Sequence, residues 1–163
     1  MGRREKPPEC QGCPLETKGL GFVSGLGPPD SQSAWLGQGP GEQEYETGVP
    51  FHPGAPSGSI LTRWINESGL MRSGLWVGNT VQCWLPQGRR AGRPYGSLDP
   101  PRRAQQHCWD HHVGPQLAEL TELWLVVPIG KPAREFLMGP TFGERYCGAP
   151  TRGQLPEFSG TTS

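Results

Sequence analysis

The sequence predicts an α/β fold in which a mainly parallel central sheet is covered by helices on both faces, giving three layers. Short apolar segments with strand character alternate along the chain with segments of helical periodicity, which is typical of parallel sheets. The length of 163 residues allows one domain of ordinary size. We therefore expect binding loops at the carboxyl ends of the strands, where such folds collect them.

The first half of the chain supplies one strand and one helix. Residues 33–36 are apolar enough to form a short strand, and a glycine-rich stretch from Gly37 to Phe51 follows it. Residues 57–68 carry apolar side chains at helical spacing, at positions 60, 61, 64 and 65. Ser57 or Ser59 is the expected N-cap of this helix.

The second half supplies two more strands and two more helices. Residues 75–81 and 123–129 are strand-like, residues 101–120 are broadly helical with an expected break at Gly114-Pro115, and residues 131–138 form a short helix. Beyond Gly139 the chain is rich in Gly, Pro and Thr and has no periodic segment. We expect a domain over residues 1–139 and a loose tail over residues 140–163.

The composition leaves little material for an apolar core. Only 33% of the residues are hydrophobic, and 25 glycines and 19 prolines approach the content of a loop-rich chain. Six tryptophans still argue for a folded core. The sequence contains no apolar run of about 18 residues and its charged start lacks a secretory pattern, so we expect no membrane association and a reducing, cytoplasmic location.

Five cysteines in a reducing compartment favour metal binding over disulfides. Cys10 and Cys13 form a CxxC pair, and Cys83 and Cys108 would complete the four thiolates that a [4Fe-4S] cluster or a structural zinc site needs. Spacing does not choose between iron and zinc. Three histidines flank Cys108 and either offer imidazole to zinc or are solvated, namely His107, His111 and His112. Cys147 is the expected free thiol.

The charge distribution has one local feature under a formal net charge of zero. Five arginines lie between Cys83 and Cys108 and are opposed only by Asp99: Arg89, Arg90, Arg93, Arg102 and Arg103. A segment of this kind binds nucleic-acid phosphates or is simply a solvated loop, and charge alone leaves both interpretations open.

Three motifs occur in a specific order: CxxCPL at residues 10–15, GQGPGEQEYETGVPF at residues 37–51, and NTVQC at residues 79–83. Together they resemble the family 4 uracil-DNA glycosylases, in which CxxCPL, a GEAPGxxEDxxGxPF loop, Nxx(K/Q)C and a fourth helical Cys follow one another. The resemblance covers about residues 9–138. It implies a uracil-DNA glycosylase-like fold and a DNA repair enzyme whose four cysteines hold a [4Fe-4S] cluster, with zinc as the alternative.

The resemblance also assigns roles to single residues. It implies that Phe51 stacks on a uracil flipped out of DNA and that Asn79 reads the polar edge of that base. The chemistry suits these residue types, because a flipped base needs an aromatic surface and an amide offers an acceptor and a donor together. The alternative interpretation is that Phe51 is a core residue and Asn79 merely ends a strand.

The glycine-rich stretch would complete the pocket. Backbone N–H groups around Gln38 and Gly39 could donate to uracil O2, and a carboxylate at Glu42 or Glu44 could orient water. Catalysis is thus predicted to involve Gln38, Glu42, Glu44 and Asn79. A phosphate-binding loop is disfavoured, since no Gly-Lys-Ser/Thr follows and three glutamates would repel phosphate.

Two departures from the family pattern define an alternative function. Gln38 stands where the family carries Glu, and no His follows His112, although the family has a late His motif. We expect a monomeric glycosylase that hydrolyses the N-glycosidic bond of uracil in DNA. The alternative is a non-catalytic relative that binds uracil or DNA and has kept the pocket and the cluster.

Overall fold

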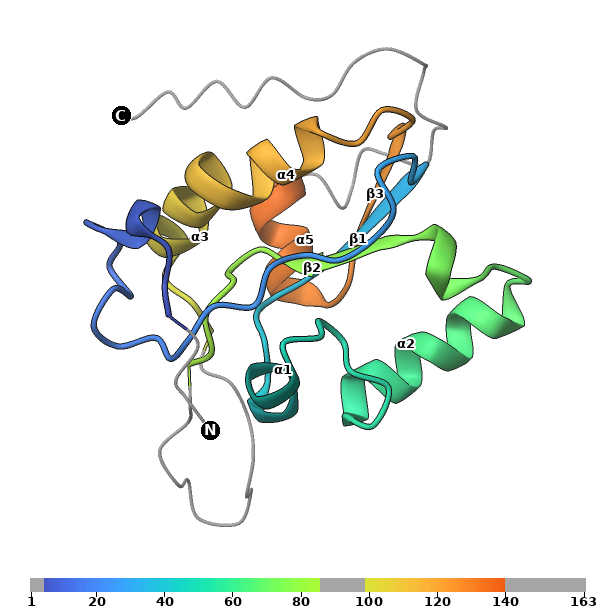
Figure 1. Ribbon diagram of the computed structural model, residues 1–163, viewed down its shortest axis with the longest axis horizontal. Helices are drawn as coiled ribbons and strands as arrows, with labels where there is room; N and C mark the ends of the chain where they lie inside the picture. Colours follow the sequence, from blue (N-terminus) through green and yellow to red (C-terminus); the bar gives the residue numbers. More distant parts are fainter. Residues whose placement is uncertain (1–4, 86–98, 140–163) are drawn as a thin grey trace.

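A three-stranded parallel sheet lies at the centre of the computed structural model, which describes residues 5–85 and 99–139 (Figure 1). The strands are β1 (Ser33–Gly37), β2 (Trp76–Asn79) and β3 (Leu125–Pro128), in the order β2-β1-β3. Leu36 of β1 pairs with Gly78 of β2 and with Pro128 of β3. The prediction of a mainly parallel sheet is confirmed.

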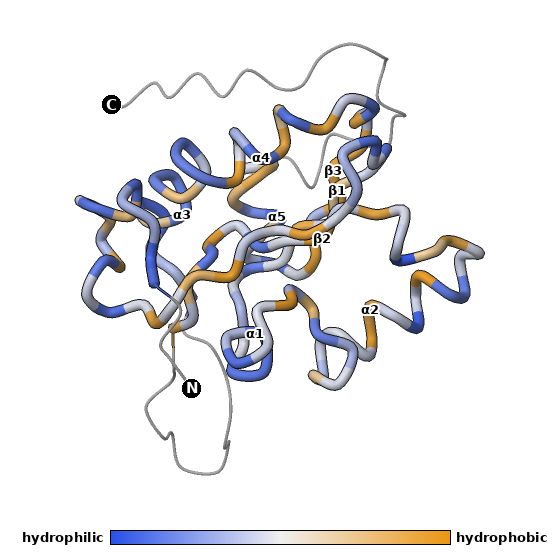
Figure 2. Tube along the Cα trace, in the orientation of Figure 1, coloured by the Kyte–Doolittle hydropathy of each residue, from blue (hydrophilic) through white to orange (hydrophobic). Residues whose placement is uncertain are grey.

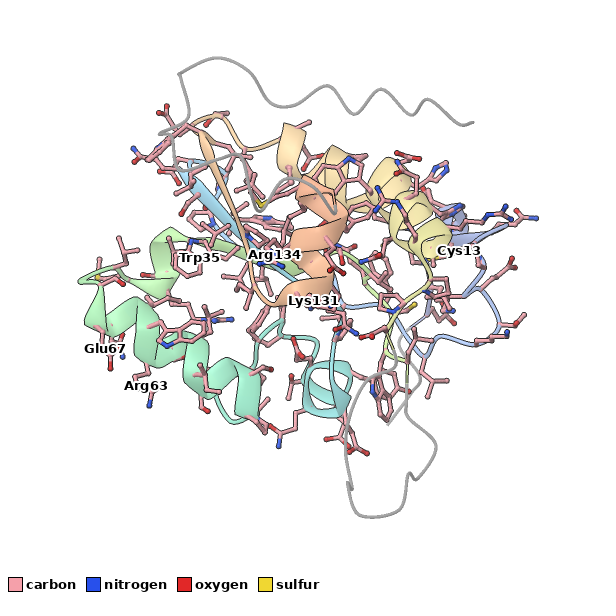
Figure 3. All side chains as sticks on the ribbon, turned by 180° about the vertical axis from the view of Figure 1, so that it is seen from behind. Cys13, Trp35, Arg63, Glu67, Lys131 and Arg134 are labelled. Carbon is pink, nitrogen blue, oxygen red and sulfur yellow. The ribbon has the colours of Figure 1, made fainter. Side chains whose placement is uncertain are left out.

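Helix α2 (Pro56–Glu67) covers one face of the sheet. Its buried residues Leu61 and Ile65 pack with Val77 of β2, and Trp35 of β1 lies against the same cluster. Successive strand residues point to opposite faces, so Trp35 faces α2 while its neighbours Ala34 and Leu36 face the other layer (Figure 3).

The opposite face is covered by α3 (Arg102–Cys108), the π-helical turn η3 (Trp109–Val113), α4 (Gly114–Ala118) and α5 (Lys131–Met138). Val113 and Leu117 pack there with Ala34 and Leu36, and Leu137 of α5 joins them. The strands are mostly apolar along their length, whereas the helices alternate between polar and apolar residues (Figure 2). Helices on both faces confirm the three-layer α/β/α arrangement.

An N-terminal segment that the sequence patterns did not reveal runs antiparallel along β2. After the single turn η1 (Pro8–Cys10), Leu26 and Val77 exchange backbone hydrogen bonds of 2.9 and 2.8 Å, and Leu20 pairs with Trp84 in the same sense. These bonds satisfy backbone groups at the outer edge of β2. They also bring the CxxC pair toward the end of β2.

Two local predictions about helices are wrong. The chain does not break at Gly114-Pro115, because the π turn η3 continues directly into α4, which begins with Gly114 and holds Pro115 in its first turn. Helix α2 begins at Pro56 with Ala55 as N-cap, so neither Ser57 nor Ser59 caps it. The Ser59 hydroxyl instead donates to the Pro56 carbonyl at 2.9 Å.

Several predictions fall on residues outside the described ranges: the loose tail over residues 140–163, the free thiol Cys147, and Arg89, Arg90 and Arg93. The division at residue 139 therefore stays a prediction. Among the helices of residues 5–85 and 99–139, none has the length and apolar character needed to cross a bilayer.

Candidate active site

The glycine-rich stretch contains a short helix that was not predicted from its sequence. Helix α1 (Glu42–Thr47) begins after Gly41 and ends at Gly48, which adopts the left-handed conformation with φ of 74°. The Glu44 carboxylate reaches back and accepts a hydrogen bond from the Gly41 N–H at 2.7 Å, which caps the first turn. The helix turns the remainder of the stretch back toward the strand ends.

Phe51, at the end of this stretch, holds a conformation unusual for a bulky residue. Its φ is 49°, and it is the one non-glycine residue with positive φ in the described chain. Its N–H donates to the Glu44 carboxylate, and Arg72 donates to the carbonyl of Pro50 just before it. A strained residue fixed on both sides is typical of a site where a side chain must be aimed.

The Phe51 ring meets Asn79 across Gly37, at the carboxyl ends of β1 and β2. A Cβ placed on Gly37 would lie 2.4 Å from Cζ of Phe51 and 2.6 Å from Oδ1 of Asn79. Phe51 and Asn79 are both buried. An aromatic ring and an amide with both donor and acceptor therefore lie side by side at the carboxyl ends of β1 and β2.

The buried carboxylate of Glu44 is hydrogen-bonded to both Phe51 and Asn79. One oxygen accepts from the Gly41 N–H, and the other accepts from the Phe51 N–H and from Nδ2 of Asn79, the latter at 3.5 Å. Burial raises the pKa of the Glu44 carboxyl, while these hydrogen bonds and the charge of Arg72 act in the opposite direction. Glu44 thus orients Phe51 and Asn79, and its oxygens are occupied by protein donors.

The other loop residues predicted to act in the site are more open. Gln38 and Gly39 are half-buried directly after β1, and Glu42 is exposed at the start of α1. The Gln38 carbonyl accepts from the Thr80 hydroxyl at 2.9 Å and from the Val81 N–H at 3.2 Å. These bonds fasten the loop to the chain that continues from β2.

A hollow of about 350 Å³ opens between α3 and α5, and neither Phe51 nor Asn79 lines it. Its walls include charged residues of both signs and are formed by Asp99, Pro100, Arg102, Gln105, Lys131, Pro132, Glu135 and Phe136. Oδ1 of Asp99 accepts a hydrogen bond of 2.9 Å from Nε2 of Gln38. Sequence reasoning assigned Asp99 no role in the pocket, and no local motif could have revealed it.

The four cysteines assigned as ligands line one common hollow. Cys10, Cys13, Cys83 and Cys108 border it together with His107 and His112. Cys13 lies on the N-terminal segment close to α3 (Figure 3). Backbone N–H groups of Leu15 and Gln82 donate to the sulfurs of Cys13 and Cys108, at 3.4 and 3.3 Å.

The electrostatics of this hollow suit a cationic group. Burial raises the pKa of the Cys83 thiol to about 11, and neighbouring Cys13 and Cys10 add to the increase. Burial likewise raises the pKa values of Cys108 and Cys10. The buried thiols of Cys83 and Cys108 would ionise readily only if a metal supplied positive charge, so this donor set fits a thiolate-ligated metal group.

The histidines beside Cys108 occupy two different environments. His112 is buried, with Nε2 at 3.4 Å from the sulfur of Cys10 and its ring edge against Phe22. Burial lowers the pKa of His112, which favours its neutral form. His107 and His111 contact each other with ring centroids 4.4 Å apart, and His107 Nε2 also lies 2.9 Å from the carbonyl oxygen of Glu9.

Comparison with known proteins identifies the family. Residues 24–157 match the model of the Uracil DNA glycosylase superfamily. The chain belongs to this superfamily. The motif resemblance is confirmed by similarity to a protein named type-4 uracil-DNA glycosylase from Thermotoga maritima, which is 31% identical over 134 residues, covering 82% of this chain and 63% of that protein.

Two further relatives with the same name extend the comparison. The Archaeoglobus fulgidus protein is 27% identical over 128 residues, covering 78% of this chain and 58% of the relative. The Saccharolobus solfataricus protein is 38% identical over 82 residues, covering 50% of this chain and 37% of the relative. The chain thus matches less than two thirds of the length of each of these type-4 proteins.

Proposed function

We propose that this superfamily member removes uracil from DNA by hydrolysing the N-glycosidic bond, as a DNA repair enzyme of the cytoplasm. The observation that carries the proposal is the convergence of Phe51 and Asn79 across Gly37 at the strand ends. The names of the type-4 relatives agree with it. A monomer is sufficient, because the residues that form the pocket come from one chain.

The geometry suggests how the site acts. The Phe51 ring stacks on the flipped base, and the Asn79 amide pairs with uracil N3–H and O4, whereas cytosine presents the opposite donor and acceptor pattern. Backbone N–H groups near Gln38 and Gly39 face the charge that develops on O2 as the base leaves. Glu44 holds the Phe51 ring and the Asn79 amide in fixed positions relative to each other.

We propose further that Cys10, Cys13, Cys83 and Cys108 hold a [4Fe-4S] cluster. In the described part of the chain, no three Cys, His, Asp or Glu side chains are grouped as ligands of a single metal ion. Four cysteine thiolates are the ligand set of a [4Fe-4S] cluster, and zinc is the alternative that the same set could hold. When bound, the cluster would tie the N-terminal segment to α3.

The test is uracil release from an oligonucleotide, followed by alkaline cleavage at abasic sites. We expect excision from uracil-containing DNA and none from the matched cytosine oligonucleotide. Asn79→Ala should abolish most of the activity, and Phe51→Ala should lower it about 5- to 150-fold, because a base–aromatic stack contributes about 1 to 3 kcal/mol. Metal-loaded protein that binds this DNA but releases no uracil would be the non-catalytic relative instead.

A further inference from the structure

The proposed hydrolysis needs a carboxylate near the sugar, and the described pocket offers few that are free. Cleavage leaves positive charge on the deoxyribose, which a nearby anion stabilises, and the attacking water must lose a proton. Gln38 is neutral, and Glu44 is buried with both oxygens bound to protein donors. Glu42 is exposed on α1, and none of the hydrogen bonds of the described residues fixes its side chain.

Asp99 meets the requirement from a different part of the chain. Its carboxylate is exposed, stands at the wall of the 350 Å³ hollow, and is held by the Gln38 amide at 2.9 Å. Gln105, also in that wall, donates to the Thr80 hydroxyl at 3.2 Å, and Thr80 donates to the Gln38 carbonyl. The hollow is therefore connected to the base pocket through Gln38 and through the residue that follows Asn79.

The size and charge of the hollow suit the sugar-phosphate of the flipped nucleotide. A volume of about 350 Å³ lies in the usual range of small-ligand sites. Arg102 and Lys131 border it and are both exposed, although Lys131 pairs with Glu135 at 3.6 Å, while Asp99 lies on the side of Gln38.

We propose that Asp99 is the catalytic carboxylate of this chain and that Gln38 positions it. The C1′–N1 bond breaks, and its electron pair leaves on uracil N1. Asp99 stabilises the sugar cation and accepts a proton from the water whose oxygen forms the new bond to C1′; that proton then passes to solvent, and the uracil anion is protonated from solvent. The inference rests on the proposed uracil excision.

The first test is Asp99→Asn in the metal-loaded full chain, with Glu46→Gln on α1 as the matched control of an exposed carboxylate outside the pocket. Single-turnover excision should fall roughly 100-fold in Asp99→Asn, the usual effect of removing one acid–base group. DNA affinity should stay equal or rise, since a negative charge is lost. Asp99→Glu should recover part of the rate, and Glu46→Gln should match the parent.

A second test exchanges the partners. Gln38→Glu alone places two carboxylates at hydrogen-bonding distance, so we expect it to lower excision even though it restores the family's residue. Combining Gln38→Glu with Asp99→Asn recreates an amide–carboxylate pair in reverse and should recover at least tenfold over the weaker single variant. If the fold-decrease in excision rate of the double variant equalled the product of the two single fold-decreases, the residues would act independently and Gln38 would not position Asp99.

A third measurement does not depend on turnover. DNA with a positively charged pyrrolidine in place of the target sugar should bind the parent at least tenfold more tightly than DNA with neutral tetrahydrofuran there, and Asp99→Asn should lose this preference. An active parent whose rate and cation preference survive Asp99→Asn would overturn the role of Asp99 alone. A parent that neither releases uracil nor prefers uracil-containing DNA would overturn the proposed function itself.

Discussion

At the scale of single residues, Gly37 allows the Phe51 ring and the Asn79 amide to approach each other. Any side chain there would enter the space between the Phe51 ring and the Asn79 amide, since even a Cβ would approach both within 2.6 Å. We expect Gly37→Ala to lower single-turnover uracil excision more than tenfold while the far-ultraviolet circular dichroism still shows a folded chain. Overpacking of this kind costs about 1 to 3 kcal/mol of stability, which leaves the fold populated.

Gly74→Ala is the matched control for that change, because a Cβ on Gly74 meets nothing within 4 Å. It should leave the excision rate unaltered. If Gly37→Ala excised uracil as fast as Gly74→Ala does, the base would have to bind somewhere other than between Phe51 and Asn79.

Glu44 predicts a pH dependence of stability. Burial raises its pKa above the ordinary 4.5, so as pH rises the unfolded chain releases this proton before the folded chain does. The free energy of unfolding contributed by Glu44 therefore falls as pH rises from 4.5 through the raised pKa. In Glu44→Gln this part of the pH dependence should vanish, as measured by urea unfolding between about pH 4 and about pH 8.

The same substitution should also reduce excision. A glutamine offers one carbonyl oxygen where the carboxylate accepts from both Gly41 and Phe51, so one buried N–H loses its acceptor at a cost of about 1 to 3 kcal/mol. Parallel pH curves for the parent and Glu44→Gln would show that another group titrates in this window.

Site residues could be predicted from the sequence where they belong to a local motif, and not where they join the site through long-range contacts. Phe51 and Asn79 belong to local motifs and could be named in advance, and the structure does bring them together. Asp99 contacts Gln38, which lies 61 residues away along the chain, and Arg72 contacts Pro50, which lies 22 residues away. The periodicity of the sequence does not predict contacts of this kind. The hydrogen bonds that occupy both oxygens of Glu44 likewise depend on the tertiary structure and could not be predicted from the sequence of the loop.

At the scale of elements, burial explains which predictions succeeded. The three strands are short apolar runs and α2 carries apolar side chains at helical spacing, and their positions were predicted closely. Helix α1 has six residues and four of the first five are polar or acidic, so it depends on the hydrogen bonds of Glu44 and on Gly48 at its end rather than on an apolar face. The expected break before Pro115 failed because a π turn absorbs the proline.

The cysteine hollow lies between the N-terminal segment, which carries Cys10 and Cys13, and α3, which ends at Cys108. Cys108→Ser should therefore yield protein without the brown colour of iron–sulfur proteins and with a lower thermal midpoint. Cys147→Ser is the control, because Cys147 is predicted to be a free thiol. This variant should keep the brown colour and the thermal midpoint of the parent. The measurements are the visible spectrum, the iron content and calorimetry on anaerobically purified protein. Colourless parent protein with one zinc per chain would exclude the iron–sulfur assignment.

At the scale of the whole molecule, DNA binding has to come from a local patch. The formal net charge is zero, so long-range attraction by the chain as a whole is weak. Arg102 and Arg103 are exposed at the start of α3, and Arg102 also borders the hollow between α3 and α5. Arg63 carries the same charge on α2, where it pairs with Glu67 at 3.8 Å on the other side of the sheet (Figure 3).

This arrangement predicts which arginines contribute to affinity. Replacing Arg102 and Arg103 by Gln should weaken binding equally for uracil-containing and ordinary duplexes, because phosphate contacts carry no base information. The slope of log affinity against log salt should become shallower by about 0.9 per lost contact. Arg63→Gln should change neither quantity. Fluorescence anisotropy at several salt concentrations measures both, and if the double variant and Arg63→Gln gave the same slope as the parent, the DNA backbone would not run along the start of α3.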